Sequence, residues 1–273
     1  MGALLVFGAG AMMAAASGEH RLFDIDAEKT EPLSKAVSAL QQHRIVLVGE
    51  QHTSKAHHEN QLAVIRRLHE AGARVAVGME MFRSDSQTAL DLWTAGKTPE
   101  DDFVRVYYDN WNFDWALYAP ILRYARDNGI AVRGLNVSRK ITSQVARRGF
   151  ASLTEEQRGK LPDVACRVDE TYMAFIKRAY GAHAHGNLNF TYFCEAQLVW
   201  DTVMAINAVD FIEAHPDHVM VIVTGNGHAW KGGIPAQIAA RSDLPVSVVL
   251  PEIPGVVEPG TVDIDDADYL FLR

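Results

Sequence analysis

Short apolar runs alternate along the chain with longer segments in which apolar and polar positions recur at helical spacing. Residues 44–48 form a continuous apolar run rich in β-branched side chains, followed by Gly49, which is typical of a strand buried on both faces. Residues 57–71 then carry apolar side chains on one face of a helix and end before Gly72. This stretch therefore predicts a buried strand followed by a crossover helix.

The same order of elements recurs downstream. Further strands are predicted at residues 74–78, 130–135, 218–224 and 245–250, a helix at 117–128, and a closing edge strand at 269–272. Buried strands that alternate with helices belong to parallel sheets. We therefore expect an α/β fold with a mostly parallel sheet flanked by helices.

A long segment at about residues 138–216 separates the third predicted strand from the fourth. It carries helical patterns at 154–161, 166–182 and around 193–214, without an intervening strand pattern. The prediction is a helical insertion that covers part of the sheet.

Composition narrows the class of protein. The chain has 273 residues, 48% hydrophobic and 22% charged, which suits one α/β domain over residues 19–273. The net charge is -8 and the basic residues occur at most in pairs such as Arg147-Arg148, so nucleic acid is not expected as a partner. Cys166 and Cys194 lack the neighbours of a zinc or disulfide motif and are expected to be buried thiols.

The amino terminus resembles a signal peptide. Residues 3–16 are rich in Ala, Gly and Met and end in small residues, although no Lys or Arg precedes them. The segment is too short to span a bilayer. We expect residues 1–18 to be a signal-peptide remnant and the protein to be exported to the periplasm or cell envelope.

Polar side chains follow each of the first four predicted strands. The set comprises Glu50 and His52, Glu80, Asn136, and Asn226 with His228. Because ligands bind beyond the carboxyl ends of the strands in open parallel sheets, these side chains are expected to share one pocket. The alternative is that Glu50 and His52 only cap a helix and that the glycines around Asn226 only form a turn.

This set of side chains has two chemical uses. His52, Glu80 and His228 are suitable ligands for a divalent metal, and a carboxylate beside metal-bound water can act as a general base. Without a metal, Glu50, His52, Glu80 and His228 are candidate acid and base catalysts.

Neighbouring segments can extend the pocket. Gln197 and Asp201 share one helix face beside Trp200 and Met204, and are predicted either to face the sheet edge or to be solvated. The pair His57-His58 either approaches the site or lies on the surface. The aromatic stretch at residues 107–115 is either core packing or a pocket wall.

The insertion carries side chains suited to a haem. Tyrosine or histidine can ligate ferric haem iron, and Lys, Arg or His can pair with the propionates. The candidates for cofactor binding in this part of the chain are Tyr172, Tyr180, His183, His185 and Lys177.

Taken in order, these motifs resemble the ChaN family of haem-binding, iron-uptake lipoproteins. The resemblance covers about residues 44–251 and rests on Gly49-Glu50-Gln51-His52, Met79-Glu80-Met81-Phe82, Trp111 with Tyr118 and Pro120, Leu135-Asn136, Gln197 with Trp200-Asp201 and Met204-Ala205, Gly225-Asn226-Gly227-His228 and Gly233-Ile234-Pro235. The chain is also distantly similar to erythromycin esterase-like and TraB/Tiki-type proteins. These share a Gly-Glu-x-His signature and are in part hydrolases or metal-dependent peptidases.

The resemblance implies an exported protein of haem and iron uptake, with an outer-membrane haem receptor as a further partner. It also implies a homodimer that encloses two stacked haems, with a tyrosine of one subunit on each iron and histidine and lysine of the other subunit at the propionates. No motif assigns these ligands to particular residues here. No cysteine follows the apolar segment, so a soluble periplasmic form is expected rather than a lipid-anchored one.

Two functions remain open from the sequence. The first is haem binding, supported by the resemblance and by the aromatic, histidine-bearing insertion. The alternative is a metal-dependent hydrolase, an esterase or peptidase, that uses the Glu and His side chains at the strand ends.

Overall fold

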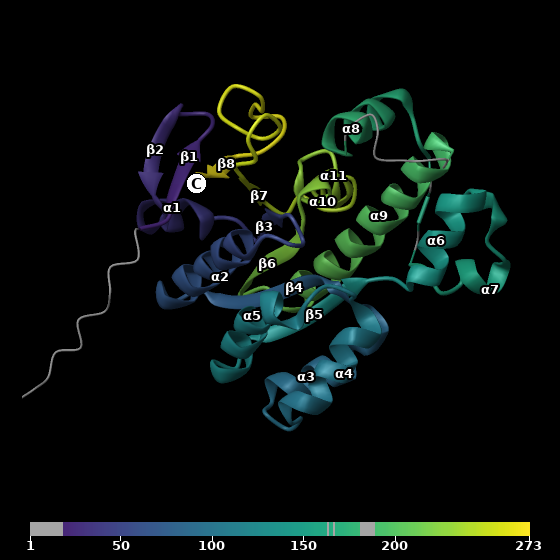
Figure 1. Ribbon diagram of the computed structural model, residues 1–273, viewed down its shortest axis with the longest axis horizontal. Helices are drawn as coiled ribbons and strands as arrows, with labels where there is room; N and C mark the ends of the chain where they lie inside the picture. Colours follow the sequence, from purple (N-terminus) through teal and green to yellow (C-terminus); the bar gives the residue numbers. More distant parts are fainter. Residues whose placement is uncertain (1–18, 163, 166, 181–188) are drawn as a thin grey trace, which may run out of the picture.

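The computed structural model describes residues 19–162, 164–165, 167–180 and 189–273. Its sheet has eight strands in the order β2-β1-β8-β7-β3-β6-β4-β5 (Figure 1). The strands are β1 (Arg21–Asp24), β2 (Lys29–Pro32), β3 (Ile45–Glu50), β4 (Arg74–Arg83), β5 (Ala131–Asn136), β6 (His218–Gly225), β7 (Val246–Pro251) and β8 (Tyr269–Phe271). The predicted α/β fold with a mostly parallel sheet is confirmed.

The five predicted buried strands form the parallel centre of the sheet. Strand β3 lies between β6 and β7, and β4 lies between β6 and β5, all paired in parallel. The register pairs Val46 of β3 with Val221 of β6, and Val77 of β4 with the same residue. The carboxyl ends of β3, β4, β5 and β6 therefore meet at one edge.

The prediction of a closing edge strand at residues 269–272 is wrong in its position. β8 pairs in parallel with β7 on one side and antiparallel with β1 on the other, so it lies inside the sheet. The β1–β2 hairpin supplies the edge. Each hairpin strand has only four residues, too few for a clear alternation of buried and exposed positions.

Helices cover both faces of the sheet (Figure 1). Those on one face are α1 (Leu33–Leu40), α2 (Lys55–Glu70), α3 (Gln87–Thr94), α4 (Glu100–Asn110) and α5 (Trp115–Asp127). The other face carries α9 (Phe190–Ala214), α10 (Asn226–Ala229) and α11 (Ile234–Ala239). Strand β3 supplies Val46 and Val48 to the first core and Ile45 and Leu47 to the second, so it is buried on both faces as predicted.

The predicted helical insertion between the third and fourth strands of the parallel core, here β5 and β6, is present. It contains α6 (Arg139–Arg148), α7 (Glu155–Arg158), α8 (Glu170–Tyr180) and α9, with a short 3-10 turn at Phe150–Ser152. Ile141 and Val145 of α6 pack with Leu153 and with Ala196 of α9. Within the described residues, no helix is both long enough and apolar enough to cross a membrane.

Helices α3 and α4 were not predicted, and they bring two aromatic side chains together in the core. Trp93 of α3 stacks on Phe103 of α4 with ring centroids 4.3 Å apart. Both side chains are fully buried. Between the two helices the chain passes through Gly96 and Pro99, which interrupt the hydrophobic period that reveals a helix.

Candidate functional site

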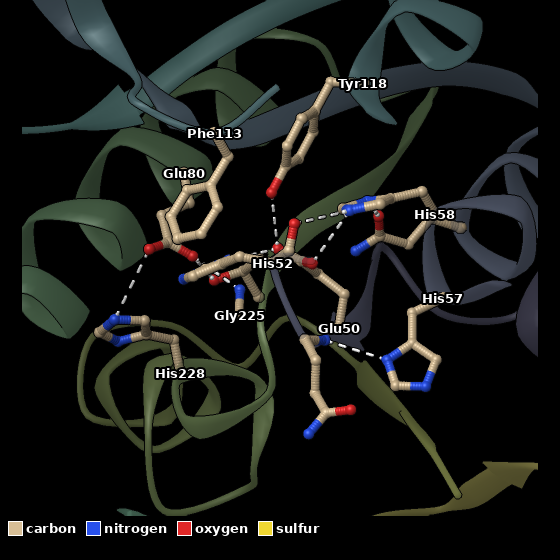
Figure 2. Close-up of polar contacts among 12 residues, drawn as sticks. Glu50, His52, His57, His58, Glu80, Phe113, Tyr118, Gly225 and His228 are labelled. Carbon is tan, nitrogen blue, oxygen red and sulfur yellow. Dashed lines mark hydrogen bonds and ion pairs between the residues drawn. The ribbon is translucent and has the colours of Figure 1, made fainter. Parts of the chain in front are cut away.

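The carboxyl ends of β3, β4, β5 and β6 border a cavity of about 610 Å³. It is lined by His52, Glu80, Met81, Arg83, Asp109, Asn110, Trp111, Asn112, Phe113, Asn136, Val137, Ser138, Arg139, Lys140, Gln197, Trp200 and His228. Figure 2 shows Glu80, His52 and His228 close together, with Glu50 on the other side of His52. The predicted convergence of polar side chains at this edge is therefore found.

The first pair in the site is Glu50 and His52. Glu50 is buried at the end of β3, and its Oε1 lies 2.6 Å from His52 Nδ1. The Tyr118 hydroxyl donates to the same oxygen at 3.0 Å, and His58 Nε2 lies 3.3 Å from Glu50 Oε2. Because Nδ1 of His52 faces a carboxylate, Nε2 is the ring atom left for a ligand.

A second pair repeats this arrangement from other elements. The buried Asp201 of α9 places Oδ1 2.6 Å from His228 Nδ1, and its Oδ2 accepts a hydrogen bond of 2.9 Å from the Tyr172 hydroxyl. Each imidazole of the site is thus oriented by a buried carboxylate that a tyrosine also contacts.

Glu80 lies between the two imidazoles (Figure 2). Its Oε2 accepts from the Gly225 amide at 2.7 Å and the Thr224 hydroxyl at 2.8 Å, and its Oε1 lies 3.8 Å from His228 Nε2. The predicted strand at residues 74–78 was too short, because β4 continues through Glu80 to Arg83. Its pairing with β5 shifts register between Met79 and Arg83, so β4 is irregular at the point where it carries Glu80.

Neighbouring charges determine the protonation states of His228 and Glu80. Burial opposes the charged form of His228, but Asp201 and Glu80 outweigh it and raise its pKa to about 9. Burial likewise opposes ionisation of Glu80, yet His228, His52 and the Gly225 amide together lower the pKa of that carboxyl. The site therefore holds an ionised Glu80 beside a protonated His228 at neutral pH.

His52 is more accessible than His228, since 30% of its side chain is exposed. Burial lowers its pKa, but the hydrogen bond to Glu50 and the charge of Glu80 exceed that effect, and the pKa of His52 is raised. A Cβ atom at Gly225 would lie 2.8 Å from Cε1 of His52, so only glycine fits beside this ring. An added side chain at Gly225 would therefore displace the imidazole.

The aromatic stretch at residues 107–115 fulfils both of its predicted alternatives. Tyr107 and Trp115 are buried in the core. Trp111 and Phe113 line the cavity, with ring centroids 5.0 and 4.8 Å from that of His52. Apolar ring surface therefore forms the wall next to the more accessible histidine.

Cations also line the same cavity. Arg83, Arg139 and Lys140 line it, and Ser138, the N-cap residue of α6, lies beside them. Arg83 bonds Asp85, while Arg139 and Lys140 are exposed and have no ion-pair partner among the described residues. The cavity thus combines an aromatic wall with a cationic border.

The remaining predicted residues divide into those at the site and those away from it. Asn136 and Gln197 are buried and line the cavity, so the helix face of Gln197 and Asp201 is not solvated. Asn226 is not a lining residue, and its buried Oδ1 lies against Gly49. His57 and His58 are buried too; His57 Nδ1 accepts from the Gln51 amide at 3.0 Å.

Two candidate cofactor residues of the insertion, Tyr172 and Lys177, do not line the cavity. Tyr172 reaches the site through Asp201, whereas exposed Lys177 lies over the Phe190 ring. Tyr180 is the last residue of α8. His183 and His185 lie outside the described residues, as do Cys166 and the amino-terminal segment, while Cys194 is buried as expected.

The predicted divalent metal finds no support. Across residues 19–162, 164–165, 167–180 and 189–273, no group of three or more His, Cys, Asp or Glu side chains is arranged to hold a metal ion. The acidic oxygens nearest the histidines accept hydrogen bonds instead. Nδ1 of His52 faces Glu50, and Nδ1 of His228 faces Asp201. Glu80 Oε2 accepts a hydrogen bond from the Gly225 amide of β6.

Sequence reasoning missed the role of Tyr118, and it offered His58 as a neighbour of the site without identifying Glu50 as its partner. Tyr118 lies on an apolar face of α5 and His58 lies on α2, and their ring centroids are 4.3 Å apart. The Tyr118 hydroxyl donates to Glu50. The sequence feature that could have revealed such a role is a polar side chain on a helix face that otherwise packs into the core, because a buried hydroxyl or imidazole needs a hydrogen-bond partner. The partner's identity depends on long-range packing.

Comparison with known proteins places this geometry in a family. The family model described as "Haem-binding uptake, Tiki superfamily, ChaN" matches residues 36–238. The chain belongs to this family. The match spans β3 to α11 and includes all four strand ends that border the cavity.

Solved structures with the same fold include ChaN of Campylobacter jejuni, described with cofacially bound haem. It has a TM-score of 0.70 at 18% identity, over 93% of this chain and 96% of that one. The erythromycin esterase mutant EreC H289N gives 0.52 at 13% identity, over 91% and 81%. The type III effector HopBA1 gives 0.51 at 12%, over 86% and 90%. At these identities the likeness shows the fold alone.

A curated relative is the chloroplastic protein RETICULATA-RELATED 5 of Arabidopsis thaliana. It is 24% identical over 217 residues, which cover 72% of this chain and 29% of the relative. The chain therefore spans under a third of the length of that relative.

Proposed function

We propose that the protein binds haem in the cavity at the strand ends, with His52 as the iron ligand. The observation that carries this proposal is the setting of His52: Nδ1 lies 2.6 Å from Glu50, and Nε2 has no hydrogen bond among the described residues. Histidines that ligate metals commonly donate their other N–H to a carboxylate, which fixes the ring and increases its basicity. Membership in the family supports the same cofactor.

The rest of the cavity suits the other parts of a haem. Trp111 and Phe113 offer apolar ring surface beside His52, against which a flat porphyrin can pack. Arg139 and Lys140 are cations without ion-pair partners in the described part of the chain, and such groups pair with propionates. The bound haem would supply iron as the cargo or redox group.

Tyr172 is the competing ligand among the described residues. Its hydroxyl donates to Asp201 at 2.9 Å, and a phenolate on iron would have to give up that bond. A phenolate would also face the buried carboxylate of Asp201, which disfavours a second negative charge. His52 requires no such rearrangement and is therefore our first assignment.

Haemin titration tests this proposal. We expect a saturable Soret shift in the wild type, a shift that persists in Tyr172→Phe, and loss of the shift in His52→Ala. Arg139→Gln with Lys140→Gln should weaken binding about tenfold through loss of two charged contacts. Absence of a saturable shift in the wild type would refute haem binding, and loss only in Tyr172→Phe would move the iron to the insertion.

The proposal extends to where the protein acts. Export to the periplasm or cell envelope is supported by the apolar segment at residues 3–16, and a role in iron uptake by the family's description. A homodimer and an outer-membrane haem receptor as partner follow from the resemblance alone. Mass measurement with and without haemin, together with fractionation of the native host, tests the dimer and the location.

A hydrolase is the second candidate, favoured by the paired carboxylate–imidazole groups. His52 Nε2 can accept a proton from water, and protonated His228 beside Glu80 can donate to a leaving group. Water would then cleave an ester or amide into an acid and an alcohol or amine. A screen of such substrates with metal analysis tests this activity; the absence of turnover, or turnover unchanged in His228→Gln, would count against it.

A further inference from the structure

A second cavity, of about 700 Å³, lies on the other side of the loop that joins β3 to α2. Its walls are the first turn of α2, the ends of β7 and β8, and residues 19–21. It shares no lining residue with the cavity that holds His52 and His228. Neither the proposed haem site nor the proposed hydrolytic groups use it.

His57 lines this second cavity and has a fixed tautomer. Its Nδ1 accepts a hydrogen bond of 3.0 Å from the Gln51 amide, and a backbone amide can only donate. The ring proton of neutral His57 must therefore reside on Nε2. Burial keeps His57 neutral by lowering its pKa, aided by the charges of His58 and Arg273 against the opposing Glu50.

The Nε2–H group of His57 is an unused donor. The residue is 8% exposed, and the nitrogen has no hydrogen-bond partner within the described residues. In Figure 2 this side of the ring points away from Glu50 and His52. The nitrogen is not among the fully buried atoms that lack a partner, so it reaches the cavity, where water or a ligand can accept its hydrogen.

Acidic and basic side chains both line the cavity. Glu59 pairs with Lys55 at 2.9 Å, Glu252 accepts from the Arg273 amide at 2.9 Å, and Glu19 accepts from the Ser34 hydroxyl. The guanidinium groups of Arg21 and Arg273 have no hydrogen bond or ion pair among the described residues. Both guanidinium groups therefore remain available to a ligand.

The first turn of α2 also favours a negatively charged ligand in this cavity. The helix has 16 residues and begins after Ser54, whose side chain accepts from the His57 amide. Ser54, Ala56 and His57 line the cavity, so the positive end of the helix dipole lies at its wall.

We propose that this second cavity binds a small oxyanion, carboxylate or phosphate, held by His57 Nε2–H and the guanidinium groups of Arg21 and Arg273. The site is separate from haem binding and does not depend on it. Because His57 also holds the Gln51 amide, the oxyanion would contact the loop that presents Glu50 and His52 to the first cavity.

Inorganic phosphate and acetate are the probes. With ¹⁵N-labelled histidine and His57 assigned through His57→Gln, we expect a saturable change at the His57 Nε2 resonance with either probe, and none with chloride at equal ionic strength. A response to phosphate alone would assign the site to phosphate groups, and a response to both would assign it to oxyanions in general.

Two exposed positions at the border provide variants that should keep the fold. Arg21→Gln with Arg273→Gln should weaken phosphate binding about fivefold, as expected for two exposed charged contacts, while Arg148→Gln on α6 should leave it unchanged. No saturable change at His57, or equal affinity in all variants, would overturn the proposal.

Discussion

His52 Nδ1 lies 2.6 Å from Glu50 Oε1, and this contact determines which nitrogen of the ring faces the cavity. Glu50 itself is held by the Tyr118 hydroxyl and by proximity to His58. The orientation of His52 therefore depends on residues of α2 and α5 that do not line the cavity. Substitutions in α2 and α5 should therefore affect His52 although these residues do not line the cavity.

Removal of the Tyr118 hydroxyl should destabilise the fold and loosen His52. Tyr118→Phe takes a hydrogen bond from a buried carboxylate, and the loss should be about 2 kcal/mol of unfolding free energy. Tyr124→Phe is a matched control, since that hydroxyl bonds His69 in a half-buried position and should cost under about 1 kcal/mol. Urea unfolding measures both; equal losses would argue against a special role for Tyr118.

His228 should make the stability depend on alkaline pH. Its pKa is raised from 6.5 to about 9, so the folded protein retains a proton that the unfolded chain releases within this window. The stabilisation is complete below pH 6.5 and decreases as pH rises towards about 9. The unfolding free energy of the wild type, compared with His228→Gln, should therefore decline between these values. A difference that stays constant or grows with pH would show that His228 is not protonated.

Gly225 should tolerate no side chain without moving His52. An added Cβ would lie 2.8 Å from His52 Cε1 and 3.5 Å from Glu80 Oε2. Gly225→Ala should therefore reduce haemin affinity at least about tenfold with little change in secondary structure. Gly159→Ala, whose Cβ would meet only ordinary contacts, is the control. Unchanged affinity in Gly225→Ala would contradict the placement of the ligand beside His52.

Haem affinity should fall in acid. Iron and a proton compete for His52 Nε2, and the pKa of this imidazole is raised because Glu50 and Glu80 outweigh burial. Affinity should be highest above that pKa and decrease as pH is lowered through it, beginning above pH 6.5. Soret titrations at several pH values measure this trend. An affinity that rises on acidification would exclude a neutral imidazole as ligand.

The parallel centre of the sheet and the convergence of the site could be predicted from the sequence. Ile45 to Val48 are apolar without interruption, which indicates a strand buried on both faces. Glu50 and His52 follow shortly after, which indicates where that strand ends. Asn136 ends β5, and Glu80 lies in the last part of β4. The rule that parallel strands end at one edge then sufficed to bring them together.

The partners of these side chains could not be predicted. Tyr118 and Glu50 are 68 residues apart, and Tyr172 and Asp201 are 29 apart. Such contacts depend on how α5 and α8 pack on the sheet, which no local pattern records. The β1–β2 hairpin was missed for another reason, because four-residue strands with mixed polarity resemble loops.

Chemical rescue of His52→Gly is the most direct measurement of whether His52 holds the iron. The wild type should show a saturable Soret shift with haemin, and His52→Gly should not. Added imidazole should restore the shift in the variant, because it can occupy the vacated position beside Glu50 and Trp111. A shift retained in His52→Gly without imidazole would contradict the assignment.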